Sequence, residues 1–189
     1  MYDPETVRVY QAYGDAIADT ALAAGSFVSP PFSLSRMTWV KPSFLWMMYR
    51  SGWALKDEGQ KRILAVDISR AGFEWAMANS CVSDAYTSAS PEKRKEAFSR
   101  HPVRIQWDPE RDLESRALPY RSLQMGLSGI AMEQYVTQWI RRITDVTSLA
   151  REIHAAVQSG AVRHALSLLP QERSYPISDT LAAIIGASR

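Results

Sequence analysis

The chain has 189 residues, of which 46% are hydrophobic. Its 22 basic and 20 acidic residues leave a net charge of +2. This balance excludes a basic nucleic-acid surface over the whole protein but not a local basic pocket. The single cysteine, Cys81, excludes an intramolecular disulfide and a cysteine-rich zinc site, and we expect it to be buried. No signal peptide and no apolar run of about 20 residues is recognisable, so we expect a cytoplasmic protein that does not span a membrane.

The first part of the chain predicts alternating strands and helices. β-Branched and aromatic residues predict a strand at 7–13, and apolar residues at helical spacing predict a helix at 15–24. A short strand at 36–41 ends at Pro42. The helix expected at 43–50 is apolar on nearly every face, which is typical of a central, buried helix.

The rest of the chain continues this mixture of elements. Two helices at 147–158 and 161–169 predict a hairpin hinged at Gly160. The irregular spacing of the elements favours an α+β fold with small mixed or antiparallel sheets and packed helices. We expect one domain, 1–189, with an α+β core over 7–146 and a C-terminal helical cap over 147–170. The other expected elements are strands at 63–68, 103–107 and 121–127, helices at 71–81, 91–100 and 129–142, and a charged loop at 108–119.

Several common functional motifs are missing from the sequence. No Gly-x-Gly-x-x-Gly follows a strand, and there is no Walker-type phosphate loop. No nucleophile elbow supports a catalytic triad. The three histidines, His101, His154 and His164, lack the spacing of metal ligands, so we expect no metal.

The densest group of aromatic and basic residues lies between Arg36 and Trp53, with three tryptophans, two arginines and one lysine. Lys41 and Ser43 stand at the start of a predicted helix, where free N–H groups and the helix dipole favour an anion. Arginine suits phosphate, and an aromatic ring suits stacking on a base, so the group predicts a nucleotide-like ligand. The alternative is that the aromatic residues only fill the core. The candidate ligand contacts here are Arg36, Trp39, Lys41, Ser43, Tyr49 and Arg50.

Two predicted strands also carry polar side chains. The first strand contains Arg8, Tyr10 and Gln11, and the late strand contains the run from Arg121 through Ser122 to Gln124. We interpret these residues as further contacts to the same ligand. The alternative is a strand with one solvated face, because side chains alternate between the two faces of a sheet.

Most of the chain, from about Val7 to Pro176, resembles a domain-of-unknown-function family. The resemblance implies membership of that family but no activity. It is carried by Val9-Tyr10-Gln11-Ala12-Tyr13, by Arg36-Met37-Thr38-Trp39-x-Lys41-Pro42-Ser43-Phe44-Leu45-Trp46-Met47-Met48-Tyr49-Arg50-Ser51-Gly52-Trp53, by Gly72-Phe73-Glu74, by Gln106-Trp107-Asp108-Pro109-Glu110-Arg111, and by Leu118-Pro119-Tyr120-Arg121-Ser122.

A second, fold-level resemblance is to the ADP-ribosyltransferase superfold, carried by the strand at Val9-Tyr10-Gln11 and the following helix that ends at Gly25. It implies an NAD site in a cleft between two small sheets, with Gln11 or Arg8 touching the nicotinamide-ribose half. The chain departs from that pattern because its late strand has no glutamate; Glu133, Glu110 or Asp108 would have to substitute. The cations also resemble the RNA 2′-phosphotransferase branch, which grips phosphate with arginines.

Three functional hypotheses follow from these patterns. The first is an enzyme that splits NAD or a related nucleotide, or transfers a group from it. The second is a module that binds a nucleotide or a nucleic-acid end without chemistry. The third is a protein-interaction domain without a small-molecule site, whose partner the sequence does not identify. In the first, Lys41, Arg50 and Arg121 hold phosphate, Trp39 or Tyr49 stacks on the ligand, and Glu133, Asp108 and Gln124 are the catalytic candidates.

Overall fold

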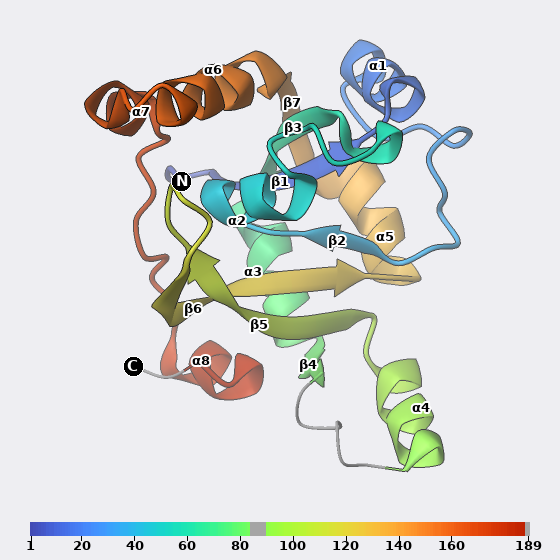
Figure 1. Ribbon diagram of the computed structural model, residues 1–189. Helices are drawn as coiled ribbons and strands as arrows, with labels where there is room; N and C mark the ends of the chain where they lie inside the picture. Colours follow the sequence, from blue (N-terminus) through green and yellow to red (C-terminus); the bar gives the residue numbers. More distant parts are fainter. Residues whose placement is uncertain (84–89, 188–189) are drawn as a thin grey trace.

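The computed structural model describes residues 1–83 and 90–187 and shows an α+β fold with two small β-sheets surrounded by helices (Figure 1). The first sheet has the strand order β1-β3-β7, and both of its strand pairs are antiparallel. Its strands are β1 (Thr6–Tyr13), β3 (Arg62–Ser69) and β7 (Ile140–Asp145). The predicted strands at 7–13 and 63–68 are therefore confirmed.

The second sheet is mixed and has the order β2-β6-β5-β4. β4 is parallel to β5, and the other two pairs are antiparallel. The expectation of small mixed or antiparallel sheets is confirmed by both sheets together. The strands are β2 (Thr38–Val40), β4 (Ser80–Val82), β5 (Val103–Arg111) and β6 (Ala117–Leu127).

The two sheets meet where β1 runs past β2. The backbone N–H of Tyr10 donates to the carbonyl of Lys41 at 2.8 Å, in an isolated bridge. One residue further along β1, the amide of Gln11 donates to the Thr38 hydroxyl and to the Trp39 carbonyl, at 2.8 and 3.0 Å. The two sheets are thus joined by one backbone hydrogen bond and by the side chain of Gln11.

The helices cover the sheets and close the ends of the molecule (Figure 1). Helices α1 and α2 end at Gly25 and Gly52, whose φ angles of 71° and 55° suit glycine. Gly160, with φ of 76°, links α6 and α7, which confirms the predicted helical hairpin. The helices are α1 (Asp15–Ala24), α2 (Phe44–Ser51), α3 (Arg70–Ala78), α4 (Pro91–Arg100), α5 (Ile130–Gln134), α6 (Thr147–Gln158), α7 (Val162–Leu168) and α8 (Asp179–Ile185).

Helix α2 packs into the core, as its composition predicts. Phe44, Met47 and Met48 are buried in one cluster with Ile63 of β3 and Ile153 of α6. Removing such large apolar side chains from water supplies about 1.5–3 kcal/mol each. Outside this cluster, Cys81 is buried as expected. Within residues 1–83 and 90–187, no helix combines the length and apolar character needed to cross a membrane.

Residues 169–178, which we call the C-terminal strap, join α7 to α8 without helical structure and run along one side of the molecule (Figure 1). Tyr175 holds the strap against α3, with its ring centroid 5.2 Å from that of Phe73. The Tyr175 ring also lies 5.1 Å from the Tyr2 ring. Beyond the strap, the indole of Trp107 donates to the carbonyl of Ile185 in α8 at 2.8 Å. The strap itself is therefore fixed to α3 and to the start of the chain.

The helix predicted at 129–142 is largely confirmed, but its last three residues, 140–142, belong to a strand. Helix α5 ends at Gln134, a π-helical turn covers Tyr135–Trp139, and β7 begins at Ile140. The sequence from Ile140 is rich in β-branched residues, and β3 pairs with it along the edge that β1 leaves open. In addition, Arg142 donates to the buried carboxylate of Asp67 on β3. These tertiary contacts override the local helical pattern.

The charged loop predicted at 108–119 is mostly strand. β5 continues to Arg111 and β6 begins at Ala117, with the two paired across a bulge after Pro109. Only a tight turn remains, and the Asp112 carboxylate accepts from two backbone N–H groups within it, at 2.9 Å each. The helix predicted at 71–81 is also too long, because it ends at Ala78 and the next residues form β4.

Candidate functional site

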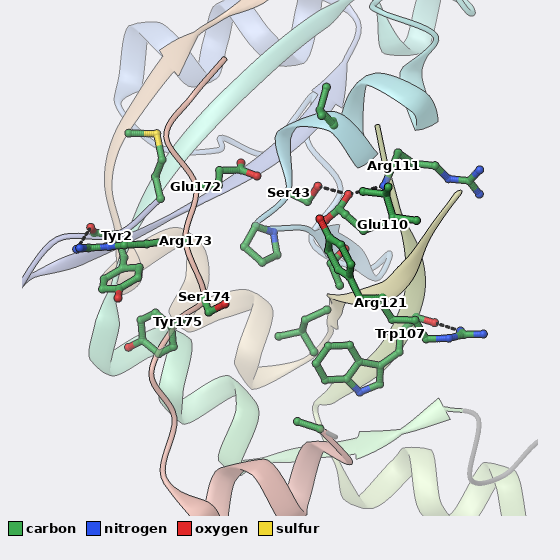
Figure 2. Close-up of a pocket in the computed structure, with 18 of the residues that line it drawn as sticks. Tyr2, Ser43, Trp107, Glu110, Arg111, Arg121, Glu172, Arg173, Ser174 and Tyr175 are labelled. Atoms are coloured by element: carbon green, nitrogen blue, oxygen red, sulfur yellow. Dashed lines mark hydrogen bonds between the residues drawn. The ribbon is translucent and has the colours of Figure 1, made fainter. Parts of the chain in front are cut away.

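A cavity of about 1120 Å³ opens between the beginning of α2, the β5–β6 hairpin and the C-terminal strap (Figure 2). Its walls come from the start of the chain, the beginning of α2, the β5–β6 hairpin, α3, α7, the strap and α8. Most of the lining is apolar, and a few polar groups converge on it, as is typical of ligand sites. The polar and aromatic side chains of this cleft include Tyr2, Ser43, Trp107, Glu110, Arg111, Arg121, Ser122, Glu172, Arg173 and Tyr175.

Two carboxylates meet at the beginning of α2. The Ser43 hydroxyl caps the helix by accepting from Trp46 N at 3.1 Å, and it donates to Glu110 Oε1 at 2.8 Å. The same Glu110 oxygen accepts from Arg111 N at 2.8 Å. The next helical N–H, that of Phe44, donates to Glu172 Oε1 at 2.9 Å. Free N–H groups and the helix dipole attract negative charge there, and this protein supplies that charge itself.

Glu172 has an unusual proton affinity for a glutamate. Desolvation by the surrounding protein, aided by the negative charge of Glu110, raises its pKa to about 7 against the lowering effects of Phe44 N and the Met1 amino group. The residue as a whole is exposed through the cleft, while its carboxyl points toward the beginning of α2 (Figure 2). Near neutral pH the carboxyl therefore exists in both protonation states.

An ion pair lies beside the cleft. The Lys41 side chain is fully buried, and its ammonium donates to Asp108 Oδ2 and to the Ser122 carbonyl at 3.1 Å each. It also lies 4.2 Å from the ring centroid of Trp46. Desolvation lowers the Lys41 pKa to about 8, although Asp108 and Glu110 oppose the shift. The pair fixes β2 to the β5–β6 hairpin.

Arginines and aromatic rings surround the rest of the cleft (Figure 2). Arg121 is exposed and donates to the Trp107 carbonyl at 2.6 Å. Arg173, on the strap, lies 4.2 Å from the ring centroid of Tyr2. Among the described residues, the buried hydroxyl oxygen of Ser122 has no hydrogen-bond partner. The walls of the cleft thus carry arginine side chains and aromatic rings.

The structure brings five of the sequence-predicted site residues into one region. Ser43, Arg121 and Ser122 line the cleft. Lys41 and Asp108 form the neighbouring ion pair, which contacts the Ser122 carbonyl. Lys41 is buried and paired, so it lacks the free ammonium that the sequence interpretation gave it.

The three candidates on β1 have internal partners instead. Arg8 forms a two-point ion pair with Asp67, with distances of 2.7 and 2.8 Å. Tyr10 is buried, and its ring packs against Phe44 at 5.4 Å. Gln11 uses its amide to join the two sheets, and its carbonyl accepts from the Tyr135 hydroxyl at 2.7 Å. None of these three side chains lines the described cleft.

The other candidates are dispersed over the molecule, outside the described lining of the cleft. Trp39 packs over Gly126, where an added Cβ would lie 2.9 Å from the indole. Exposed Arg50 donates to Gln60 at 3.0 Å. The Tyr49 ring lies under the Arg111 guanidinium at 3.8 Å. Of the remaining candidates, Arg36 is exposed before β2, Gln124 is buried in β6, and Glu133 is exposed on α5.

Sequence reasoning gave too little weight to two cleft residues. Glu110 was named only as a substitute carboxylate, although it lies in the quoted segment Gln106–Arg111. Glu172 lies in an irregular segment after Pro170, where no local pattern marks it. Only the contact with Phe44 identifies it. Over residues 1–83 and 90–187, no group of three or more His, Cys, Asp or Glu side chains is arranged to hold a metal ion.

Comparison with known families identifies the family of the chain. A family model described as "Domain of unknown function (DUF4291)" matches residues 1–175. The matched region contains both sheets and most of the cleft, including Glu110 and Glu172. No curated protein matches the chain.

Proposed function

The chain belongs to the DUF4291 family of unknown function, and we propose that it binds a nucleotide in its cleft and acts on NAD or a nucleotide phosphate in an ADP-ribosyltransferase-like reaction. The observation that carries the proposal is the convergence of Ser43, Arg121 and Ser122 with two carboxylates on one cavity of about 1120 Å³. The volume lies slightly above the range of about 300–1,000 Å³ that is common for ligand pockets, which leaves room for a ligand as large as a dinucleotide.

Each group in the cleft has a role in this proposal. Arg121 and Arg173 supply exposed cations for phosphate. Trp107 and Tyr175 supply aromatic surface for a base. Glu110 supplies the negative charge that stabilises a ribosyl carbon as it becomes positive. Arg121 and Arg173 thus take the phosphate-binding role that we predicted for Lys41 and Arg50, and Glu110 takes the role that we predicted for Glu133.

The proposal is tested by measuring thermal stability with NAD, ADP-ribose, ATP and a short RNA. A ligand at about 100 times its dissociation constant adds about 2.7 kcal/mol, which corresponds to a rise in Tm of about 5–10 °C for a chain of this size. We expect such a rise with at least one nucleotide. Arg121→Ala should reduce the rise, whereas Arg151→Ala, an exposed change on α6, should leave it unchanged.

The outcomes separate the proposal from its alternatives. No Tm shift with any of the four probes contradicts nucleotide binding and favours a protein-interaction domain. A shift that weakens steeply with salt, without turnover of the nucleotide, favours the second candidate, a module that binds a nucleotide or RNA end. The exposed arginines at the cleft favour this second candidate over the interaction domain.

A further inference from the structure

Two glutamates from distant parts of the sequence bind consecutive residues at the beginning of α2. Glu110 of β5 accepts from the Ser43 hydroxyl at 2.8 Å, and Glu172 of the strap accepts from Phe44 N at 2.9 Å. Both side chains line the cleft, with Ser43 between them in Figure 2. One Oε atom of each carboxyl is thus held in place by hydrogen bonds.

The surroundings of the two carboxyls differ. Two donors, Ser43 Oγ and Arg111 N, fix Glu110 as an acceptor. Glu172 has one donor and faces the charge of Glu110, the Met1 amino group and the buried Tyr10 hydroxyl, and its raised pKa of about 7 reflects mainly desolvation. Pairs of carboxyls in unlike surroundings often divide acid–base work from charge stabilisation.

We propose that Glu172 is the acid–base residue of the cleft and that it removes a proton from the hydroxyl that attacks a bound nucleotide, while Glu110 stabilises the ribosyl carbon. This inference rests on the proposed function. With water as the attacking group and NAD as the nucleotide, the water O–H proton passes to Glu172 as the oxygen bonds to ribose C1′. The bond from C1′ to the nicotinamide nitrogen breaks, and nicotinamide leaves with the electron pair. Glu172 then releases the proton to solvent.

The positions of the other candidate carboxyls explain why we assign this role to Glu172. Asp108 is already paired with the Lys41 ammonium at 3.1 Å. Glu133 is exposed on α5, outside the described lining of the cleft. A proton carrier works best when its pKa is close to the working pH, and of the carboxyls lining the cleft Glu172 has a pKa raised to this region.

The test follows NAD cleavage, with fluorescent etheno-NAD as the probe, for the unmodified protein and for Glu172→Gln and Glu110→Gln. Glutamine retains an acceptor for Phe44 N but cannot take the proton. We expect Glu172→Gln to lower kcat by about 10²–10⁴-fold while the Tm rise with NAD persists. The kcat of the unmodified protein should increase with pH through a midpoint near 7, and the variant should lose this dependence. Glu96→Gln, whose carboxylate pairs with Arg100 on α4 at 2.5 Å, outside the described lining of the cleft, is the matched control.

Each outcome decides between the two proposals. Unchanged kcat and an unchanged pH profile in Glu172→Gln overturn the role of Glu172, while continued cleavage leaves the proposed function standing. NAD binding with no cleavage at any pH overturns the acid–base inference but retains the nucleotide site. Absence of any nucleotide binding overturns both. Because the pH profile of the unmodified protein is informative by itself, the test holds even if a variant does not fold.

Discussion

The backbone N–H of Phe44 donates to the carboxylate of Glu172, 128 residues further along the chain, at 2.9 Å. The contact gives a backbone N–H at the beginning of α2 a hydrogen-bond acceptor, and it places a desolvated carboxyl in the cleft. It therefore couples local helix capping to the proton affinity of a candidate catalytic group. This coupling gives a stability signature that needs no ligand.

We expect Glu172→Gln to change how stability depends on pH. The folded pKa of about 7 lies above the ordinary glutamate value of 4.5, so the folded state holds the proton more tightly than the unfolded state. The resulting stabilisation is complete below about pH 4.5 and is lost as pH rises through 7. Solvent at the cleft screens the carboxyl, so we expect about 1 kcal/mol, or about 2–4 °C in Tm. Glu96→Gln should keep the slope of the unmodified protein in the same melting series, and an identical slope in Glu172→Gln would contradict the assignment.

Lys41→Met should destabilise the fold by about 2–4 kcal/mol in urea unfolding. The change leaves the partly buried Asp108 without its cation and the Ser122 carbonyl without its Lys41 donor. Lys56→Met, an exposed change, should cost less than about 0.5 kcal/mol. Adding Asp108→Asn to Lys41→Met should recover part of the loss, because the uncompensated charge is removed. A Lys41→Met protein as stable as the original would show that the ion pair does not hold the hairpin.

Gln11→Leu should cost about 2–4 kcal/mol of unfolding free energy. Its amide joins Thr38 and the Trp39 carbonyl across the sheets, and its carbonyl accepts from Tyr135. Leucine removes the Gln11 partner of the Trp39 carbonyl and of the Tyr135 hydroxyl, while the Thr38 hydroxyl keeps the Tyr13 hydroxyl at 2.9 Å. Tyr135→Phe removes only one of the hydrogen bonds and should cost about 1 kcal/mol. Equal losses in the two variants would show that Gln11 does not link the sheets.

Gly72→Ala should cost about 1–3 kcal/mol. A Cβ at this position would lie 2.4 Å from Cγ of Trp139, closer than real contacts allow. Gly59→Ala is the matched control, because its Cβ would meet only the flexible Asp57 carboxylate, at 3.2 Å. Thermal melting of both variants measures the difference. Similar Tm values for the two would contradict the close packing of α3 on Trp139.

Local signals were sufficient for much of the fold. The run from Phe44 to Met48 predicted a buried helix, and the Ser43 cap and Gly52 end match its bounds. The strand at Ile140 could not be predicted in the same way, because its helical spacing is local and its pairing with β3 is not. Helix α8 carried recognisable signals, a Ser178 cap and a terminal Gly186, which the sequence interpretation did not use.

The candidate site was predicted by residue type more than by position. Ser43 was placed correctly at a helix beginning that attracts negative charge, and the structure fills that position with Glu110 and Glu172. Lys41 and Arg8 were taken for ligand contacts, but Asp108 and Asp67 pair with them. A cation in a sequence does not reveal whether a carboxylate elsewhere in the chain already neutralises it.

We expect the strap to open at a lower free-energy cost than the two sheets. It has no helix or strand of its own, so it can lift away from α3 while both sheets remain intact. Each such opening would release the Phe44 amide, which would then exchange its hydrogen with solvent before the amides of β1 and β3. Hydrogen exchange at the Phe44 amide therefore reports how often the strap opens.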